Sequence, residues 1–102
     1  MTRIAVLQMK SGIEPQDNAA AIVRAITKAK AGGARMLFTP EMSGMLDRDR
    51  KRAAEKIVTS DKDPVLAAVR EAAAREGVWV SLGSLAVQRP DGKWANRAFL
   101  VD

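Results

Sequence analysis

The sequence contains no cysteine and no histidine. Without cysteine, these 102 residues hold no disulfide, no thiol nucleophile and no thiolate metal site. Without histidine, they lack the most common general base and the most common metal ligand of proteins. Chemistry that needs either side chain is therefore beyond what this chain supplies by itself.

Long apolar runs are also missing, and no segment reaches the length needed to span a membrane. The opening segment, Met1 to Met9, has one basic residue and an apolar run too short for a signal peptide. We therefore predict a first strand there and a cytoplasmic protein. Apolar residues make up 47% of the chain, which is typical of one small globular domain and argues against disorder.

The charge is basic but spread along the chain. The net charge is +5, and the one dense run, Arg48 to Arg52, contains Asp49 and no aromatic residue. This pattern favours a solvated helix face over a phosphate-binding patch. We expect neither a nucleic acid nor a membrane as a partner.

Local hydrophobic patterns predict seven elements in the order β-α-β-α-α-β-β. Short apolar runs predict strands at residues 3–9, 36–39, 78–87 and 96–101. Apolar side chains at helical spacing predict helices from Pro15 to Gly32-Gly33, from about residue 47 to 58, and from Pro64 to Gly77. An α/β fold follows, with a right-handed parallel crossover between the first two strands and an antiparallel hairpin through residues 89–93.

The predicted helices carry apolar stripes that cover one face of the sheet. The inward residues are Ala19, Ile22, Val23, Ile26 and Ala29 in the first helix, Ala53, Ala54 and Ile57 in the second, and Val65, Leu66, Val69, Ala72 and Ala73 in the third. The first three strands are apolar on both faces or nearly so, and the first is typical of a strand covered on both. Because little in the sequence covers the other face, we expect a second copy, a second sheet or further chain to do so.

The segment Arg35 to Gly44 delivers a carboxylate at the end of a strand. Pro40 has no N–H for a neighbouring strand, so pairing stops there and Glu41 is free to point into a cavity. In open α/β sheets, ligands bind at the carboxyl ends of the strands. Taken alone, however, a Pro-Glu pair after a strand is more often a solvated loop segment than a catalytic one.

Other polar residues favour structural roles. Asn96 is expected to tie the start of the fourth strand to a neighbouring loop, with substrate contact as the alternative. Ser81 and Ser84 have no accompanying base and no Gly-x-Ser-x-Gly elbow, which argues against a nucleophile. Gly83 is expected to permit a close approach of two backbone segments.

Several further residues have two interpretations each. Met36, Met42 and Met45 flank Glu41 and either line an apolar pocket or, more commonly for methionine, fill the core. Trp79 and Trp94 are spaced as strand residues, so we expect them to pack in a core or an interface. Gly32-Gly33 follows a helix rather than a strand, which favours a helix cap over a phosphate loop.

Segments along almost the whole chain match a known pattern: Ile4–Met9, Asn18 with Ala31–Ala34, Leu37–Gly44, Pro64–Val78, Gly83–Leu85, and Asp91–Ala98 with its Asn96. Their order and spacing resemble the N-terminal part of the nitrilase superfamily, the carbon–nitrogen hydrolases. The segments Thr39–Arg52 and Ser81–Asn96 are most similar to the branch of nitrilase-like omega-amidases and deaminated glutathione amidases.

The resemblance implies an α-β-β-α sandwich, in which two sheets pack face to face with helices outside. It also implies a Glu-Lys-Cys set that hydrolyses amides or nitriles through a thioester, without a cofactor or a metal. Only the glutamate maps onto this sequence, at Glu41, as the general base. Family members commonly form dimers or larger assemblies, so the resemblance also implies a homo-oligomer.

Residues 1–102 are accordingly expected to be one incomplete carbon–nitrogen hydrolase domain, whose C-terminal part with Lys and Cys is absent. Lys93 lies in the predicted hairpin turn, and Lys51, Lys56 and Lys62 lie in polar stretches, so none replaces the missing lysine. We expect the front part of an enzyme that cleaves a small carboxamide, inactive alone and associated with the missing part or with its own copies. The alternative is a stand-alone small α/β binding or assembly module that uses an exposed sheet face.

Overall fold

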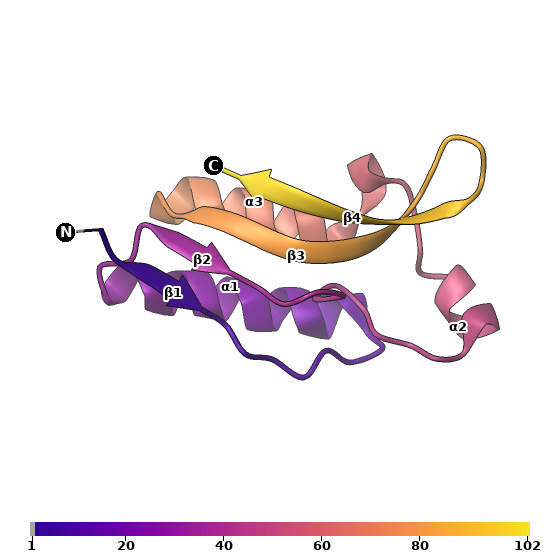
Figure 1. Cartoon of the computed structure of the whole chain (residues 1–102), viewed down its shortest axis with the longest axis horizontal. Coiled ribbons are helices and arrows are strands. Elements are labelled where there is room, and N and C mark those ends of the chain that lie inside the picture. Colours follow the sequence, from indigo (N-terminus) through magenta and orange to yellow (C-terminus); the bar gives the residue numbers. More distant parts are fainter. Residues whose placement is uncertain (1) are drawn as a thin grey trace.

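The computed structural model describes residues 2–102 and contains the strands and helices in the predicted order (Figure 1). The elements are β1 (Ile4–Val6), α1 (Pro15–Ala31), β2 (Met36–Phe38), α2 (Arg50–Ala54), the 3-10 turn η1 (Ser60–Lys62), α3 (Pro64–Glu76), β3 (Trp79–Gln88) and β4 (Trp94–Val101). The sequence pattern missed only η1, because a single 3-10 turn has no apolar periodicity of its own.

The four strands form one sheet in the order β1-β2-β3-β4. β1 pairs parallel to β2, β2 pairs parallel to β3, and β3 pairs antiparallel to β4. The hairpin turn is closed by Arg89 N–H donating to the Lys93 carbonyl at 2.7 Å and Gly92 N–H donating to the Arg89 carbonyl at 2.9 Å. The predicted hairpin is therefore confirmed, although β4 begins at Trp94 rather than at Asn96.

Local chemistry sets the ends of the two long helices. Pro15 opens α1 as predicted, whereas the left-handed residue after it is Gly33 (φ 81°) and not Gly32 (φ −82°). Asp63 caps α3 by accepting hydrogen bonds from the backbone N–H groups of Val65 and Leu66. Gly77 closes the same helix at φ 67°, a conformation that glycine adopts without steric cost.

The second predicted helix, over residues 47–58, is much shorter in the structure. α2 covers only Arg50–Ala54, and Ala54, which was expected to face inward, is exposed, whereas Ala53 and Ile57 are buried as expected. The chain leaves the helix after Ala54, and the Val58 carbonyl then accepts the backbone N–H of Gln88 from the end of β3.

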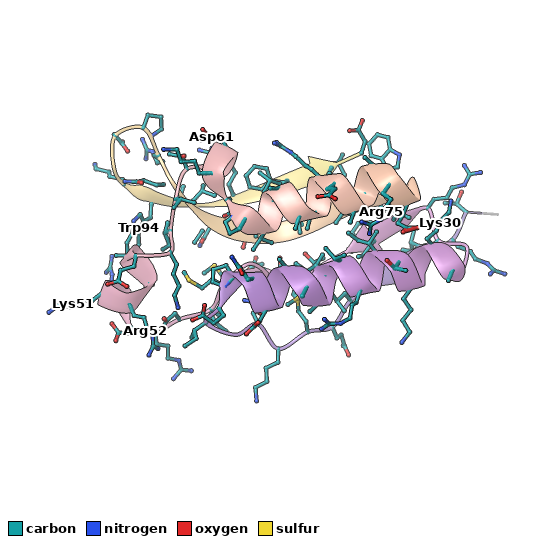
Figure 2. All side chains as sticks on the ribbon, turned by 180° about the vertical axis from the view of Figure 1, so that it is seen from behind. Lys30, Lys51, Arg52, Asp61, Arg75 and Trp94 are labelled. Atoms are coloured by element: carbon teal, nitrogen blue, oxygen red, sulfur yellow. The ribbon has the colours of Figure 1, made fainter. Side chains whose placement is uncertain are left out.

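The core lies between the sheet and the two long helices. α1 and α3 run side by side across one face of the sheet, as the views from the two sides show (Figures 1 and 2). The stripes predicted for α1 and α3 supply this core, with Val23 partly buried and the other nine residues buried. From the sheet come Leu37, Val78, Val80, Leu82, Leu85, Val87 and Val101.

No helix covers the opposite face along β1, β2 and the adjacent ends of β3 and β4 within residues 2–102, and we call this the open face. It exposes Ile4 (59%), Val6 (71%), Trp79 (47%) and Leu100 (63%). The expectation that β1 is covered on both faces is therefore wrong for this chain, because both long helices lie on the other side. Trp79 is likewise not in the core, while the uncovered apolar face itself was predicted.

We predict that the purified 102-residue chain self-associates through the open face. Val6→Lys combined with Leu100→Lys should shift it toward monomer, because charged side chains resist the burial that a stable interface requires. Sedimentation velocity over a range of protein concentrations measures the change. Ala74→Lys, on the exposed side of α3, adds one charge elsewhere and should leave association intact. A wild-type chain that stays monomeric at high concentration contradicts the prediction.

Candidate functional site

Glu41 lies in the turn that follows β2. Pairing of β2 continues as far as Thr39, whose backbone N–H donates to the Ser81 carbonyl at 3.0 Å. Pro40 has no N–H to continue the ladder, and Glu41 then begins the turn with its side chain exposed to solvent. The structure thus places this carboxylate at the carboxyl edge of the parallel strands, the edge at which ligands bind in such sheets.

Strand β3 holds the far side of this turn. Met42 N–H donates to Ser84 Oγ at 2.8 Å, and Ser43 N–H donates to the Ser84 carbonyl at 3.2 Å. Met42 has φ 53°, a left-handed conformation that L residues other than Asn, Asp and His rarely adopt. The two hydrogen bonds that Ser84 accepts therefore define the backbone directly after Glu41.

The near side of the turn is held by Thr39 and Gly83. Thr39 Oγ1 accepts the Gly83 N–H at 3.2 Å and lies 3.1 Å from Ser43 Oγ, with which it shares a hydrogen bond. A Cβ atom on Gly83 would lie 2.5 Å from the Pro40 carbonyl carbon and oxygen. The predicted close backbone approach at Gly83 is confirmed, since any side chain there would displace the segment that carries Glu41.

Helix α1 contributes a third clamp, Asn18. Its Nδ2 donates to the carbonyls of Gly12 and Gly44, at 2.8 and 2.9 Å, and its Oδ1 accepts the Gly12 N–H at 2.9 Å. The residue is only 4% exposed, so it ties the end of the Glu41 loop to the segment before α1 from inside the protein. Sequence reasoning did not find this role, although an asparagine within the apolar stripe of a helix was a signal for it.

Two hollows flank the turn. The first, about 420 Å³, is lined by Val6, Leu7, Gln8, Met9, Phe38, Thr39 and Pro40. The second, about 250 Å³, is lined by Met42, Met45, Asp47, Arg50, Ala53, Ile57, Ala86, Trp94, Ala95 and Asn96. Glu41 lies between Pro40 of the first hollow and Met42 of the second. Met42 and Met45 therefore line a cavity, although Met45 also belongs to a small buried cluster.

Of the two charged residues that line the second hollow, Asp47 is paired with an arginine and Arg50 stacks on a tryptophan. Arg52 binds Asp47 with both Nε and Nη2, each at 2.7 Å, and this contact lowers the pKa of Asp47 from 3.8 to about 2. The Arg50 guanidinium instead lies over the ring of Trp94, with its central carbon 5.5 Å from the ring centroid. Figure 2 shows Trp94 at the same end of the molecule as Arg52 and α2. The negative charge of Asp47 is therefore balanced by Arg52, whereas Arg50 adds a positive charge at this hollow.

The remaining candidates are dispersed. Ser84 uses its hydroxyl to hold the turn, and Asn96 is exposed on β4 where it lines the second hollow beside Trp94. The expected tie from Asn96 to a neighbouring loop stays a prediction. Lys56 pairs with Glu14 at 2.8 Å and lines a small hollow with Gly44 and Met45. Among the residues from 2 to 102, no three His, Cys, Asp or Glu side chains gather as metal ligands do, and no helix has the length and apolarity needed to cross a membrane.

The sequence pattern of the family described as Carbon-nitrogen hydrolase matches residues 3–102. The chain is 31% identical over 99 residues to the Nitrilase and fragile histidine triad fusion protein NitFhit of Drosophila melanogaster. Its structure is similar to that of the C. elegans NitFhit protein, with a TM-score of 0.83 at 26% identity over 97% of the chain. It is also similar to the NitN amidase of Nesterenkonia, with a TM-score of 0.80 at 26% identity over all of the chain.

The chain spans only part of the length of these relatives. It covers 21% of the Drosophila protein, 24% of the C. elegans structure and 40% of the Nesterenkonia amidase. Structures of that amidase describe an active-site cysteine modified by acrylamide in a variant with glutamate replaced by glutamine, and a complex with butyramide. The present chain has no cysteine.

We predict that Asn18→Ala destabilises the fold by about 1–3 kcal/mol, because the buried Gly44 carbonyl loses its donor. Asn18→Asp should be at least as harmful, since a carboxylate of the same shape only accepts hydrogen bonds. Urea unfolding followed by circular dichroism measures both. Gln16→Ala, an exposed change near the start of the same helix, is the control. Equal stability of the Asn18 and Gln16 variants contradicts the clamp.

Proposed function

This chain belongs to the carbon–nitrogen hydrolase family, and from that premise we propose that it is the Glu41-bearing part of a cysteine-dependent amidase. Because it has no cysteine, the nucleophile must come from a part of the enzyme outside these residues. In this proposal the lysine of the catalytic set, which the family resemblance implies, comes from the same outside part. Residues 1–102 alone are therefore inactive in this proposal. They supply one carboxylate, the loop that aims it and one of two sheets.

In the proposed reaction, the cysteine sulfur attacks the amide carbon and Glu41 accepts the thiol proton. The C–N bond breaks as that proton passes to the leaving nitrogen, which departs as ammonia and leaves a thioester. Glu41 next removes a proton from water, the hydroxide attacks the thioester, and the carboxylic acid and the thiol are released. The lysine stabilises the negative oxygen that forms in each addition.

The observation that carries this proposal is the clamped turn at the end of β2. Ser84, Gly83 and Asn18 hold the backbone around a glutamate whose own side chain makes no part of that network. These contacts satisfy the buried backbone of the loop and at the same time fix the segment that carries the carboxylate. A rigid backbone beneath a free carboxylate is what a general base requires, because its reach and direction determine the rate of proton transfer.

The open face supports the same proposal. In a sandwich of two sheets, the exposed Val6, Trp79 and Leu100 would pack against the second sheet, and Glu41 would become enclosed at the edge between them. The alternative, a stand-alone assembly module, uses this face equally well but gives the clamped glutamate no task.

For the substrate we propose a small carboxamide whose acyl chain carries a carboxylate. The Nesterenkonia amidase has been captured with acrylamide and with butyramide, which are small amides. The 250 Å³ hollow next to Met42 has room for a short acyl chain, and Arg50 adds a positive charge at its wall. A guanidinium binds a carboxylate through paired hydrogen bonds, which favours omega-amides of dicarboxylic acids over neutral amides.

Glu41→Gln in the complete enzyme should lower kcat at least about 100-fold, because the amide cannot accept a proton. Steady-state kinetics with a small amide, together with thermal unfolding, measure activity and folding separately. Glu55→Gln, an exposed glutamate at the end of α2, is the matched control and should retain activity. Wild-type turnover by a folded Glu41→Gln variant would remove Glu41 from the mechanism.

Arg50→Gln should raise the KM for omega-amides that carry a carboxylate about 10-fold, the loss expected for one charged hydrogen-bonding partner. The KM for butyramide should change much less, because that amide has no anion for Arg50 to bind. Arg48→Gln removes an exposed charge two positions away and serves as the control. An equal effect of Arg50→Gln on both substrates contradicts the assigned substrate class but leaves the role of Glu41 untouched.

A further inference from the structure

Met42 is the only non-glycine residue with a positive φ, 53°, among residues 2–102, and it directly follows Glu41. Its side chain offers no hydrogen bond to its own backbone, which is how Asn or Asp offset this conformation. The backbone is thus strained at the residue directly after Glu41. Such strain persists only where surrounding contacts hold it.

The contact that holds it is Ser84. Its Oγ accepts the Met42 N–H at 2.8 Å, and its carbonyl accepts the next N–H along the chain, that of Ser43, at 3.2 Å. Ser84 is 8% exposed, so water does not readily replace this hydroxyl. Ser84 therefore binds the N–H groups of the two residues after Glu41. The first of them, Met42, precedes Ser84 by 42 positions in the sequence.

Ser84 is placed there by a bulge in β3. Leu82 pairs with Phe99 and Leu85 pairs with Arg97, so β3 has one residue more than β4 in this interval. Leu82 and Leu85 are both buried against the helices, which leaves Gly83 and Ser84 as the irregular pair. Bulges are common next to active sites because they redirect a side chain out of the regular ladder.

We propose that Ser84 is a positioning residue for Glu41, which acts by holding Met42 in its left-handed conformation. The inference rests on the proposed role of Glu41 as general base. Ser84 does not touch the substrate in this arrangement. Without its hydroxyl, the Met42 peptide would relax to a negative φ, and the carboxylate of Glu41 would move away from the thiol and the water that it serves.

The test is a double-mutant cycle between positions 84 and 42 in the complete enzyme. Ser84→Ala should lower kcat about 10- to 100-fold, the effect of a displaced catalytic group, with KM within about threefold. In a Met42→Gly background, the same change should cost much less, because glycine adopts a positive φ without support. Ser84→Thr keeps the hydroxyl and should restore most of kcat.

Thermal unfolding and kcat are measured for each variant, so that loss of folded enzyme is separated from loss of rate. A folded Ser84→Ala enzyme with unchanged kcat overturns the inference, and so does an equal loss in the Met42 and Gly backgrounds. If Ser84→Ala does not fold, Ser84→Cys takes its place, because a thiol has a similar size but is a weak hydrogen-bond acceptor. A loss of kcat that the Met42→Gly background removes then supports the inference, and an unchanged kcat overturns it. Glu41→Gln tests the premise separately: full activity there refutes the general base, whereas loss there with a neutral Ser84→Ala refutes only the positioning.

Discussion

The loop from Thr39 to Gly44 depends on hydrogen bonds from two elements that approach it from different sides. Ser84 of β3 binds the peptides after Glu41, and Asn18 of α1 binds the last carbonyl of the loop. An irregular segment cannot pair its own backbone groups, and buried groups without partners destabilise a fold. The same polar contacts therefore satisfy the buried backbone of the loop and determine where its carboxylate lies.

Core packing and the site meet at the bulge in β3. Before the bulge, Val80 and Leu82 point toward the helices, and after it Leu85 and Val87 do so. The extra residue reverses the alternation of side chains, so that one long strand keeps its apolar residues in the core on both sides of the irregularity. The two residues at the bulge are Gly83 and Ser84. Gly83 lets the backbone of the loop approach, and Ser84 binds that backbone.

The open face and the two hollows lie on the parts of the molecule that the long helices leave free. The short helix α2 does not lie with α1 and α3. It packs beyond the end of β2, where Ala53 and Ile57 form a small buried cluster with Met45. This short element brings Arg50 over Trp94 and completes the second hollow. An apolar sheet face that the helices leave uncovered is the arrangement expected of one half of a two-sheet sandwich.

Local rules in the sequence were sufficient for the element order, the end of α3 at Gly77, the turn at residues 89–93 and the place of Glu41 after a strand, since each depends on neighbours within a few positions. The hydrogen bonds of Asn18 to Gly44 and of Met42 to Ser84 could be seen only in the folded structure, because each joins residues more than twenty positions apart. The stacking of Arg50 on Trp94 is of the same kind. Periodicity and turn chemistry thus determine what a segment becomes, whereas the partners of a buried polar group exist only after distant segments have packed together.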